Sequence, residues 1–161
     1  MSTVSHGPRP YDALAETVRS RIAPGAERDA VMQTVADALW DGLREHGVSW
    51  VGFYVARVDG EGLDLGPHRD QPACSPIGLH GACGQSFRSG RALVVRDVRE
   101  LGDRYIACDP RDRSEVVVPV RDDAGRVWAV LDLDSHEVGA FDEGDAAGLV
   151  RVLAVAFGGS R

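Results

Sequence analysis

Three acidic residues stand out because two predicted strands place them on one surface. The segments 115–121 and 126–134 alternate in hydrophobicity and are separated by a short turn sequence, which is typical of a β-hairpin. A two-residue turn puts Glu115 opposite Asp134, and a turn centred one residue earlier puts it opposite Asp132. Both registers place the three acids on one face, since side chains alternate along a strand. An unpaired residue in either strand would break this pattern.

Such a group of carboxyls can hold protons at neutral pH. Carboxylates a few ångströms apart repel each other, so at least one pKa is raised and a proton is shared. A neutral carboxyl can donate this proton to a reacting oxygen. The remaining negative charge suits a cation, such as a substrate ammonium group or a metal ion. The alternative is that Glu115 is solvated and Asp134 only caps the turn after its strand.

The chain has three cysteines, Cys74, Cys83 and Cys108. An odd, small number argues against a framework of structural disulfides and favours metal, redox or nucleophilic chemistry, or simple burial. The chain contains no lysine, which excludes Schiff-base catalysis by a lysine amine.

The order of helices and strands predicts an antiparallel sheet flanked by helices. Apolar residues recur every three or four positions near both ends of the chain and every second position in the segments between. The predicted helices span 11–22, 27–46, 82–88 and 143–157. The predicted strands span 50–57, 63–65, 92–95, 115–121 and 126–134. No alternating strand-helix-strand pattern is present, so the expected fold class is α+β.

The two faces of the predicted hairpin differ in composition. The apolar face consists of Val116, Val118, Val120, Val127, Ala129, Leu131 and Leu133. This face must pack against helices. The face with the acids also carries Val117, Pro119, Trp128 and Val130. It therefore has the composition of a pocket wall with polar groups at one end.

Two aromatic residues and two long loops complete the candidate site. Trp50 and Tyr54 lie on one face of the first strand, about 13 Å apart along it, a separation at which two rings can bracket a small ligand. The irregular segments 66–81 and 99–113 each hold a cysteine. Loops of this length in compact domains are usually functional or disordered.

Size and charge limit the class of protein. The chain of 161 residues fits one domain, which we expect at 10–158 after a flexible tail at 1–9. The net charge of −7 weighs against binding to nucleic acid or to anionic lipid. No apolar run is long enough to cross a membrane, and the N-terminal segment lacks the apolar region of a secretory signal. We therefore expect a cytoplasmic protein.

Short segments in a fixed order resemble the free methionine-(R)-sulfoxide reductases, a family built on a GAF domain. The segments are Trp50–Tyr54, Leu65–Pro67, Pro72–Cys74, Gly81–Gly84, Ile106–Asp109, Ser114–Pro119 and Val130–Ser135. The resemblance extends over about residues 30–157. It implies a GAF-like fold, and the combination of segments is more specific than any one of them.

The resemblance implies an activity and roles for the cysteines. The family reduces free L-methionine-(R)-sulfoxide to methionine, with thioredoxin as the usual reductant and without metal, flavin or nucleotide. Cys108 would be the attacking thiolate, Cys74 the resolving cysteine and Cys83 a second thiol able to enter disulfide exchange. The loop between Cys74 and Cys83 is one residue shorter than in the family, so Cys83 remains an alternative resolving residue. Family members often pair through their helices, which implies a possible homodimer.

The resemblance also assigns the acidic and aromatic residues. Glu115, Asp132 and Asp134 would handle the sulfoxide oxygen and the substrate ammonium group. Trp50 and Tyr54 would enclose the S-methyl end of the substrate. A sulfoxide sulfur becomes a good electrophile when its oxygen is protonated or strongly hydrogen-bonded, which a neutral carboxyl can do.

Two other functions stay open at this point. A non-catalytic GAF domain that senses a small molecule or a redox state would share the fold, with incidental or redox-sensing cysteines. A metal site could form from His68, Cys74, His80 and Cys83, although their spacing is unlike that of a zinc knuckle or ribbon. The three acids could also hold Mg²⁺ or Ca²⁺, although no EF-hand spacing accompanies them.

Overall fold

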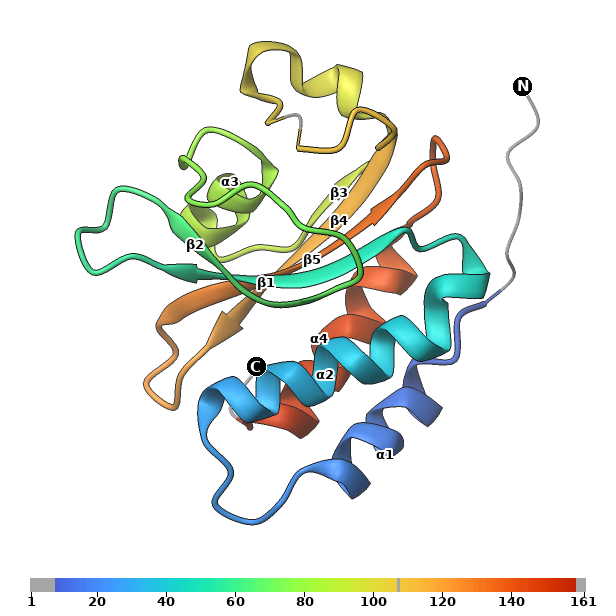
Figure 1. Cartoon of the computed structure of the whole chain (residues 1–161), viewed down its shortest axis with the longest axis vertical. Coiled ribbons are helices and arrows are strands. Elements are labelled where there is room, and N and C mark those ends of the chain that lie inside the picture. Colours follow the sequence, from blue (N-terminus) through green and yellow to red (C-terminus); the bar gives the residue numbers. More distant parts are fainter. Residues whose placement is uncertain (1–7, 107, 159–161) are drawn as a thin grey trace.

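The computed structural model describes residues 8–106 and 108–158 and shows a central sheet with helices on both faces (Figure 1). The helices are α1 (Tyr11–Arg21), α2 (Arg28–Leu43), α3 (Ala82–Ser89) and α4 (Glu143–Phe157), with short 3-10 helices η1 (Arg44–His46) and η2 (Val98–Arg104). The strands are β1 (Trp50–Ala56), β2 (Leu63–Arg69), β3 (Leu93–Val95), β4 (Ser114–Arg121) and β5 (Val127–Ser135).

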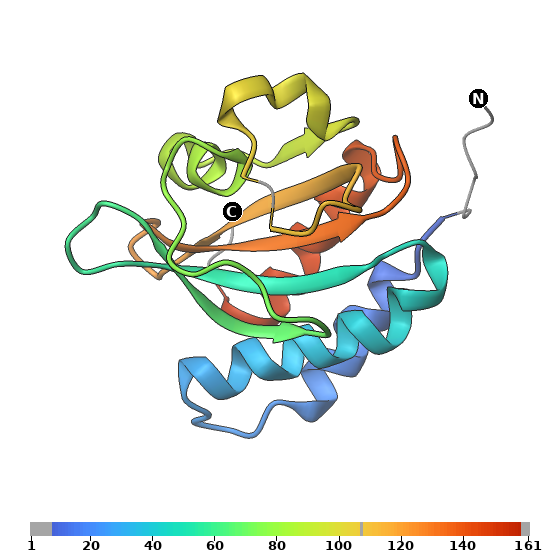
Figure 2. The same cartoon turned by 45° about the horizontal axis from the view of Figure 1, so that its top comes forward.

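All neighbouring strands of the sheet are antiparallel, in the order β2-β1-β5-β4-β3. Helices α1, α2 and α4 cover one face, and α3 lies on the opposite face together with the segment that contains η2 (Figures 1 and 2). The expected α+β class, with an antiparallel sheet flanked by helices, is confirmed.

The core is divided between the two faces of the sheet. On the face covered by α1, α2 and α4, the β4 and β5 residues Val116, Val118, Leu131 and Leu133 have no exposed surface. On the other face a smaller apolar cluster surrounds the first turn of α3 and includes Val117 and Val130. The alternation of side chains along the hairpin therefore divides its residues between two separate packing regions.

The register of the β4-β5 hairpin places Glu115 opposite Asp134 and Val117 opposite Asp132, as a two-residue turn predicts. A bulge between Val120 and Arg121 adds one unmatched residue to β5, next to the turn and away from the acids.

The bulge turns Trp128 to the helix-covered face, so its predicted place on the acid face is wrong. The Trp128 ring meets Phe157 of α4 edge-on, with ring centroids 5.5 Å apart. The Arg28 guanidinium of α2 lies 3.8 Å from the same ring centroid. Trp128 therefore contributes to packing between the sheet and the helices.

Two strand and loop boundaries differ from the sequence prediction. Strand β2 continues to Arg69 rather than ending at Leu65. It is an edge strand, and an edge strand can include a proline such as Pro67, which has no N–H to donate. Within the segment predicted as irregular before Cys108, η2 forms a 3-10 helix.

Arg9, which the prediction assigns to a flexible tail, is anchored in the fold. Its guanidinium donates hydrogen bonds to the backbone oxygens of His46 and Ala140 and pairs with Asp145 at 2.9 Å. Residues 1–7 of the predicted tail lie outside the described residues. None of the described helices is long and apolar enough to span a membrane.

Candidate active site

One cavity on the α3 side of the sheet gathers most of the predicted site residues. Its volume is about 70 Å³. Its lining includes Trp50, Tyr54, Cys83, Cys108, Glu115, Asp132 and Asp134. These side chains come from β1, β4, β5, α3 and the loop before β4, so the fold brings together residues from distant parts of the sequence.

Cys74 and Cys108 form a disulfide at this cavity, with their Cα atoms 5.5 Å apart. The two residues come from the two long loops, and Cys108 is exposed whereas Cys74 is half-buried. Cys83 is a free, buried thiol. The disulfide therefore joins the pair that the resemblance implies, and one of its two residues is exposed to solvent.

The loop that carries Cys74 is held against β1 and β2 by side-chain hydrogen bonds. The Tyr54 hydroxyl donates to the backbone oxygen of Cys74 at 3.0 Å. The indole Nε1 of Trp50 donates to the backbone oxygen of Gln71 at 2.9 Å. The backbone N–H of Leu65 donates to the Ser75 hydroxyl. These bonds fix the position of Cys74 without regular secondary structure.

The two aromatic rings do not bracket a space between them as predicted. Trp50 and Tyr54 have ring centroids 6.0 Å apart and tilted by 35°. The Trp50 ring lies over Gly52, where a Cβ atom would clash with it. His68 of β2 stacks on the other side of Trp50, with ring centroids 5.8 Å apart. Trp50 and Tyr54 thus form an aromatic wall of the cavity, and His68 supports Trp50 from outside the lining.

Cys83 is placed by close contacts at the start of α3. A Cβ atom on Gly84 would overlap the backbone of Leu79, so only glycine allows the preceding loop to fold back onto the helix. A Cβ atom on Gly81 would lie 2.8 Å from Ile106, which belongs to the loop that carries Cys108. The two glycines therefore bring Cys83 and the Cys108 loop to the same side of the sheet.

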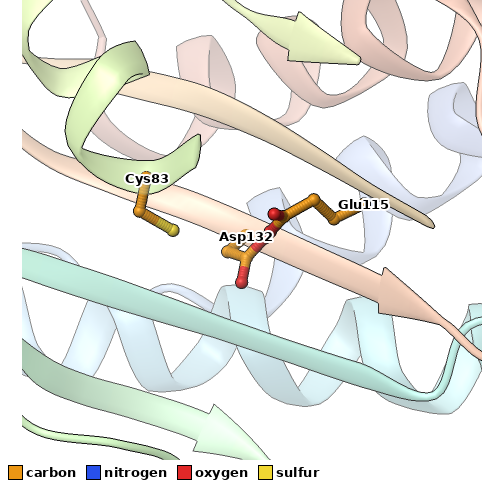
Figure 3. A group of neighbouring side chains, drawn as sticks. All are labelled: Cys83, Glu115 and Asp132. Carbon is orange, nitrogen blue, oxygen red and sulfur yellow. The ribbon is translucent and has the colours of Figure 1, made fainter. Parts of the chain in front are cut away.

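The sulfur of Cys83 points toward two carboxyl groups (Figure 3). Its Sγ atom and one oxygen each of Glu115 and Asp132 all lie within 4.8 Å of one another. Asp132 is paired with Gly52 of β1 and Val117 of β4, and it is 5% exposed. The small neighbour on β1 leaves room for the Trp50 ring beside these groups.

Burial of the acids together favours their protonated forms. Burial raises the pKa of Asp132 and of Asp134 well above the ordinary carboxyl range, and charge repulsion among the acids raises both further. Burial also raises the pKa of Glu115, while hydrogen bonds to Asp132 and Asp134 oppose that rise. The two aspartates therefore hold protons more strongly than Glu115, which the sequence could not show.

The Cys83 thiol is protonated, whereas a reactive cysteine is a thiolate. Burial raises the pKa of its thiol well above the usual value, and the charges of Asp132 and Glu115 raise it further. A thiol of this kind stays protonated at neutral pH.

The sequence analysis missed two cavity residues that carry unpaired polar atoms, Ser49 and Asp112. Among the described residues, three buried side-chain atoms lack a hydrogen-bond partner: Ser49 Oγ, Asp112 Oδ1 and Asp132 Oδ1. All three residues line the cavity. Buried polar atoms are rarely left unpaired, so these atoms mark a site for polar groups of a ligand. The acidic character of Asp112, near Cys108 in the sequence, was the only signal available.

Arg111 and Arg113, which follow Cys108 in the sequence, donate hydrogen bonds to neighbouring groups of their own loop. The Arg111 guanidinium donates to the Asp109 carboxylate at 3.0 Å, and this bond lowers the pKa of Asp109 to about 2. Arg113 donates to backbone oxygens of its own loop. Both arginines stabilise the loop after Cys108.

The metal site considered from the sequence does not form in the described residues. His68 stacks on Trp50, Cys74 is in the disulfide, and neither belongs to a group of potential ligands with Cys83. The potential ligand groups among the described residues are Cys83 with Glu115 and Asp132, and Asp109 with Asp112 and His136.

Comparisons with known proteins agree with the fold. The family model for the GAF domain matches residues 25–156. The chain is 34% identical to protein ZMO0507 of Zymomonas mobilis and covers 88% of it with 90% of its own length. It is 32% identical to the free methionine-R-sulfoxide reductase of Escherichia coli, with 78% of this chain and 73% of that protein covered.

A solved structure shares both the fold and part of the sequence. It is the free methionine-R-sulfoxide reductase from Neisseria meningitidis in complex with its substrate, which is 34% identical. The TM-score is 0.81, with 91% of this chain and 85% of that chain covered. The chain belongs to the GAF-domain family, and within it to the group of the free methionine-R-sulfoxide reductases.

Proposed function

We propose that the protein reduces free L-methionine-(R)-S-oxide to L-methionine, using Cys108 as the nucleophile and thioredoxin as the reductant. The observation that carries this proposal is the Cys74–Cys108 disulfide beside the acid-lined cavity. The E. coli relative named for this activity and the N. meningitidis relative solved with its substrate support it.

The first step transfers the sulfoxide oxygen to the protein. The Cys108 sulfur attacks the sulfoxide sulfur while a protonated aspartate donates to the sulfoxide oxygen. The hydroxyl group then passes from the substrate sulfur to the Cys108 sulfur as the bond between the two sulfurs breaks, which releases methionine and leaves Cys108 as a sulfenic acid. Asp132 or Asp134 suits the donor role, because burial raises the pKa of both carboxyls and favours their protonated form.

The second step forms the disulfide and releases water. The Cys74 sulfur attacks the Cys108 sulfenic acid, and the oxygen leaves as water after taking up a proton. Two electrons have then passed from two thiols to the sulfoxide. A thioredoxin dithiol attacks the exposed Cys108–Cys74 disulfide and restores both thiols. The buried Cys83 is a reserve thiol that can enter exchange when the loops move.

Substrate binding is expected to use the negative charge and the aromatic wall. Glu115 accepts hydrogen bonds and is the carboxyl best able to ionise against the α-ammonium group, together with the unpaired oxygen of Asp132. Trp50 and Tyr54 provide apolar surface for the S-methyl group. This assignment predicts that the ammonium group is required for binding.

The test is NADPH consumption coupled through thioredoxin and thioredoxin reductase, with the R and S epimers of free methionine sulfoxide compared. We expect turnover with the R epimer and little with the S epimer. N-acetyl-methionine sulfoxide, which lacks the ammonium charge, serves as the matched control and should not be reduced.

A sensor domain would give a different result in the same assay. It would bind methionine sulfoxide in a calorimetric titration but consume no NADPH, and that outcome would replace the reductase with a non-catalytic GAF domain. Pairing of two chains into a homodimer stays a prediction, which sedimentation equilibrium of the purified protein can check.

A further inference from the structure

Two polar residues at the edge of the cavity have no role in the proposed function. Asp112 lies in the loop between Cys108 and β4, and His136 follows the last residue of β5. The Asp112 side chain is 12% exposed and the His136 side chain is 40% exposed. Asp112 therefore belongs to the wall of the cavity, whereas His136 reaches the solvent.

Contacts connect these two residues to the acids of the cavity. The Nε2 atom of His136 lies 3.8 Å from the unpaired Oδ1 of Asp112 and 3.6 Å from a carboxylate oxygen of Asp109. A movement of about 1 Å brings the first pair within hydrogen-bond range. Asp112 and Asp134 line the same cavity, and their side-chain interaction lowers the pKa of Asp112.

We propose that His136 and Asp112 form a proton relay that carries protons from solvent to Asp134. Asp134 is in turn hydrogen-bonded to Glu115 and Asp132, so protons that arrive there reach the whole acid group. The relay rests on the proposed reductase function and adds to it the route by which the donor acid regains its proton.

The reaction consumes protons that a buried acid must replace. Reduction of one sulfoxide by two thiolates takes up two protons and gives one thioether, one disulfide and one water. One proton reaches the sulfoxide oxygen in the first step, and the second leaves with the water. Glu115 and Asp132 are more than nine-tenths buried, and bound substrate would cover them further. A path that does not cross the substrate is therefore useful in every cycle.

The surroundings of Asp112 allow it to exchange protons near neutral pH. Its pKa is raised to about 7 by burial and then by the charges of Asp109 and Glu115. The charge of Arg111 and the side-chain interaction with Asp134 act in the opposite direction. An imidazole can accept a proton on one ring nitrogen and release one from the other, which suits His136 to the solvent end.

The relay is tested by the rate of methionine formation over repeated turnovers with saturating thioredoxin, measured as a function of pH, because the donor acid must regain its proton between cycles. His136→Gln should lower this rate by about tenfold above neutral pH, less than the about hundredfold that a directly acting general acid supplies. Added imidazole should restore the rate toward that of the wild type. A merely structural role for His136 would not respond to imidazole.

Two further variants complete the experiment. Asp112→Asn should slow the reaction by a similar factor, but imidazole should not restore it, because the inner link is missing. His80→Gln alters an exposed histidine outside the cavity lining and should keep the wild-type pH profile. If wild type forms methionine and His136→Gln keeps the same pH profile, the relay is wrong. If wild type forms none, the proposed function itself fails.

Discussion

Alternate residues of the β4-β5 hairpin serve opposite purposes on its two faces. On the helix-covered face, Leu131 and Leu133 are fully buried among apolar side chains and stabilise the fold. On the cavity face, Asp132 lies between them in sequence, is also buried, and leaves an oxygen atom without a hydrogen-bond partner. Burial of an unpaired polar group costs stability, which only a ligand can recover.

This difference teaches that the molecule separates stability from chemistry by strand alternation. Neighbouring positions along one strand should therefore respond in opposite ways to substitution. Changes to the acids on the cavity face should remove activity without weakening the fold. Changes on the helix-covered face should weaken the fold without removing the activity of folded molecules.

The largest effect is expected for Cys108→Ser. Loss of the nucleophile should reduce thioredoxin-coupled turnover by about a thousandfold or more, while the helix-covered core stays intact. The rate is measured with the R epimer, and circular dichroism checks the fold. Turnover within a few-fold of the wild type would assign the nucleophile to another residue.

A smaller but distinct loss is expected for Cys74→Ser. The first step needs only Cys108, so this variant should form about one methionine per protein molecule and then stop cycling with thioredoxin. Mass spectrometry of quenched samples measures both the product and the oxidised cysteine. Continued cycling would show that Cys83 resolves the sulfenic acid instead.

Asp132→Asn and Leu131→Ala form a matched pair across the two faces. The first should lower turnover by about a hundredfold, because it removes a proton donor, and should leave the free energy of unfolding the same or higher. The second should lower the free energy of unfolding by about 2–5 kcal/mol and leave the turnover of folded molecules nearly unchanged. Urea denaturation and the coupled assay measure the two quantities. Equal destabilisation by both changes would contradict the separation of the faces.

The smallest effect concerns the pH dependence of stability. The pKa of Asp132 is raised in the folded state, so folding favours its protonated form. The contribution of Asp132 to the free energy of unfolding should therefore be fully present below the unfolded pKa of about 4 and should fall as pH rises toward the folded value. Asp132→Asn should make this dependence shallower. An unchanged slope between the variant and the wild type would show that Asp132 ionises in the fold as it does in water.

Much of the fold and part of the site follow from alternation and periodicity. The predicted pairing of Glu115 with Asp134 is correct, although the turn has three residues between Asp122 and Arg126, because the bulge on β5 shifts the register by one residue. The same bulge, invisible in the sequence, moves Trp128 to the helix-covered face. Strand periodicity could place the acids on one face but could not show how strongly each holds a proton.

Loop residues were the least predictable part of the site. The pairing of Cys74 with Cys108 came from family resemblance, and in the structure it depends on hydrogen bonds from Trp50 and Tyr54 to the loop backbone. Asp112 was missed because its role depends on tertiary contacts with Asp134 that no local pattern encodes.

The central claim is tested most directly by one stoichiometric reaction. Reduced protein is mixed with an equal amount of free methionine-(R)-sulfoxide in the absence of thioredoxin, quenched with a thiol-alkylating reagent and mapped by peptide mass spectrometry. We predict one methionine per protein molecule, a Cys74–Cys108 disulfide and an alkylated Cys83. Absence of methionine, or methionine formed while Cys108 remains alkylated as a free thiol, would contradict the account.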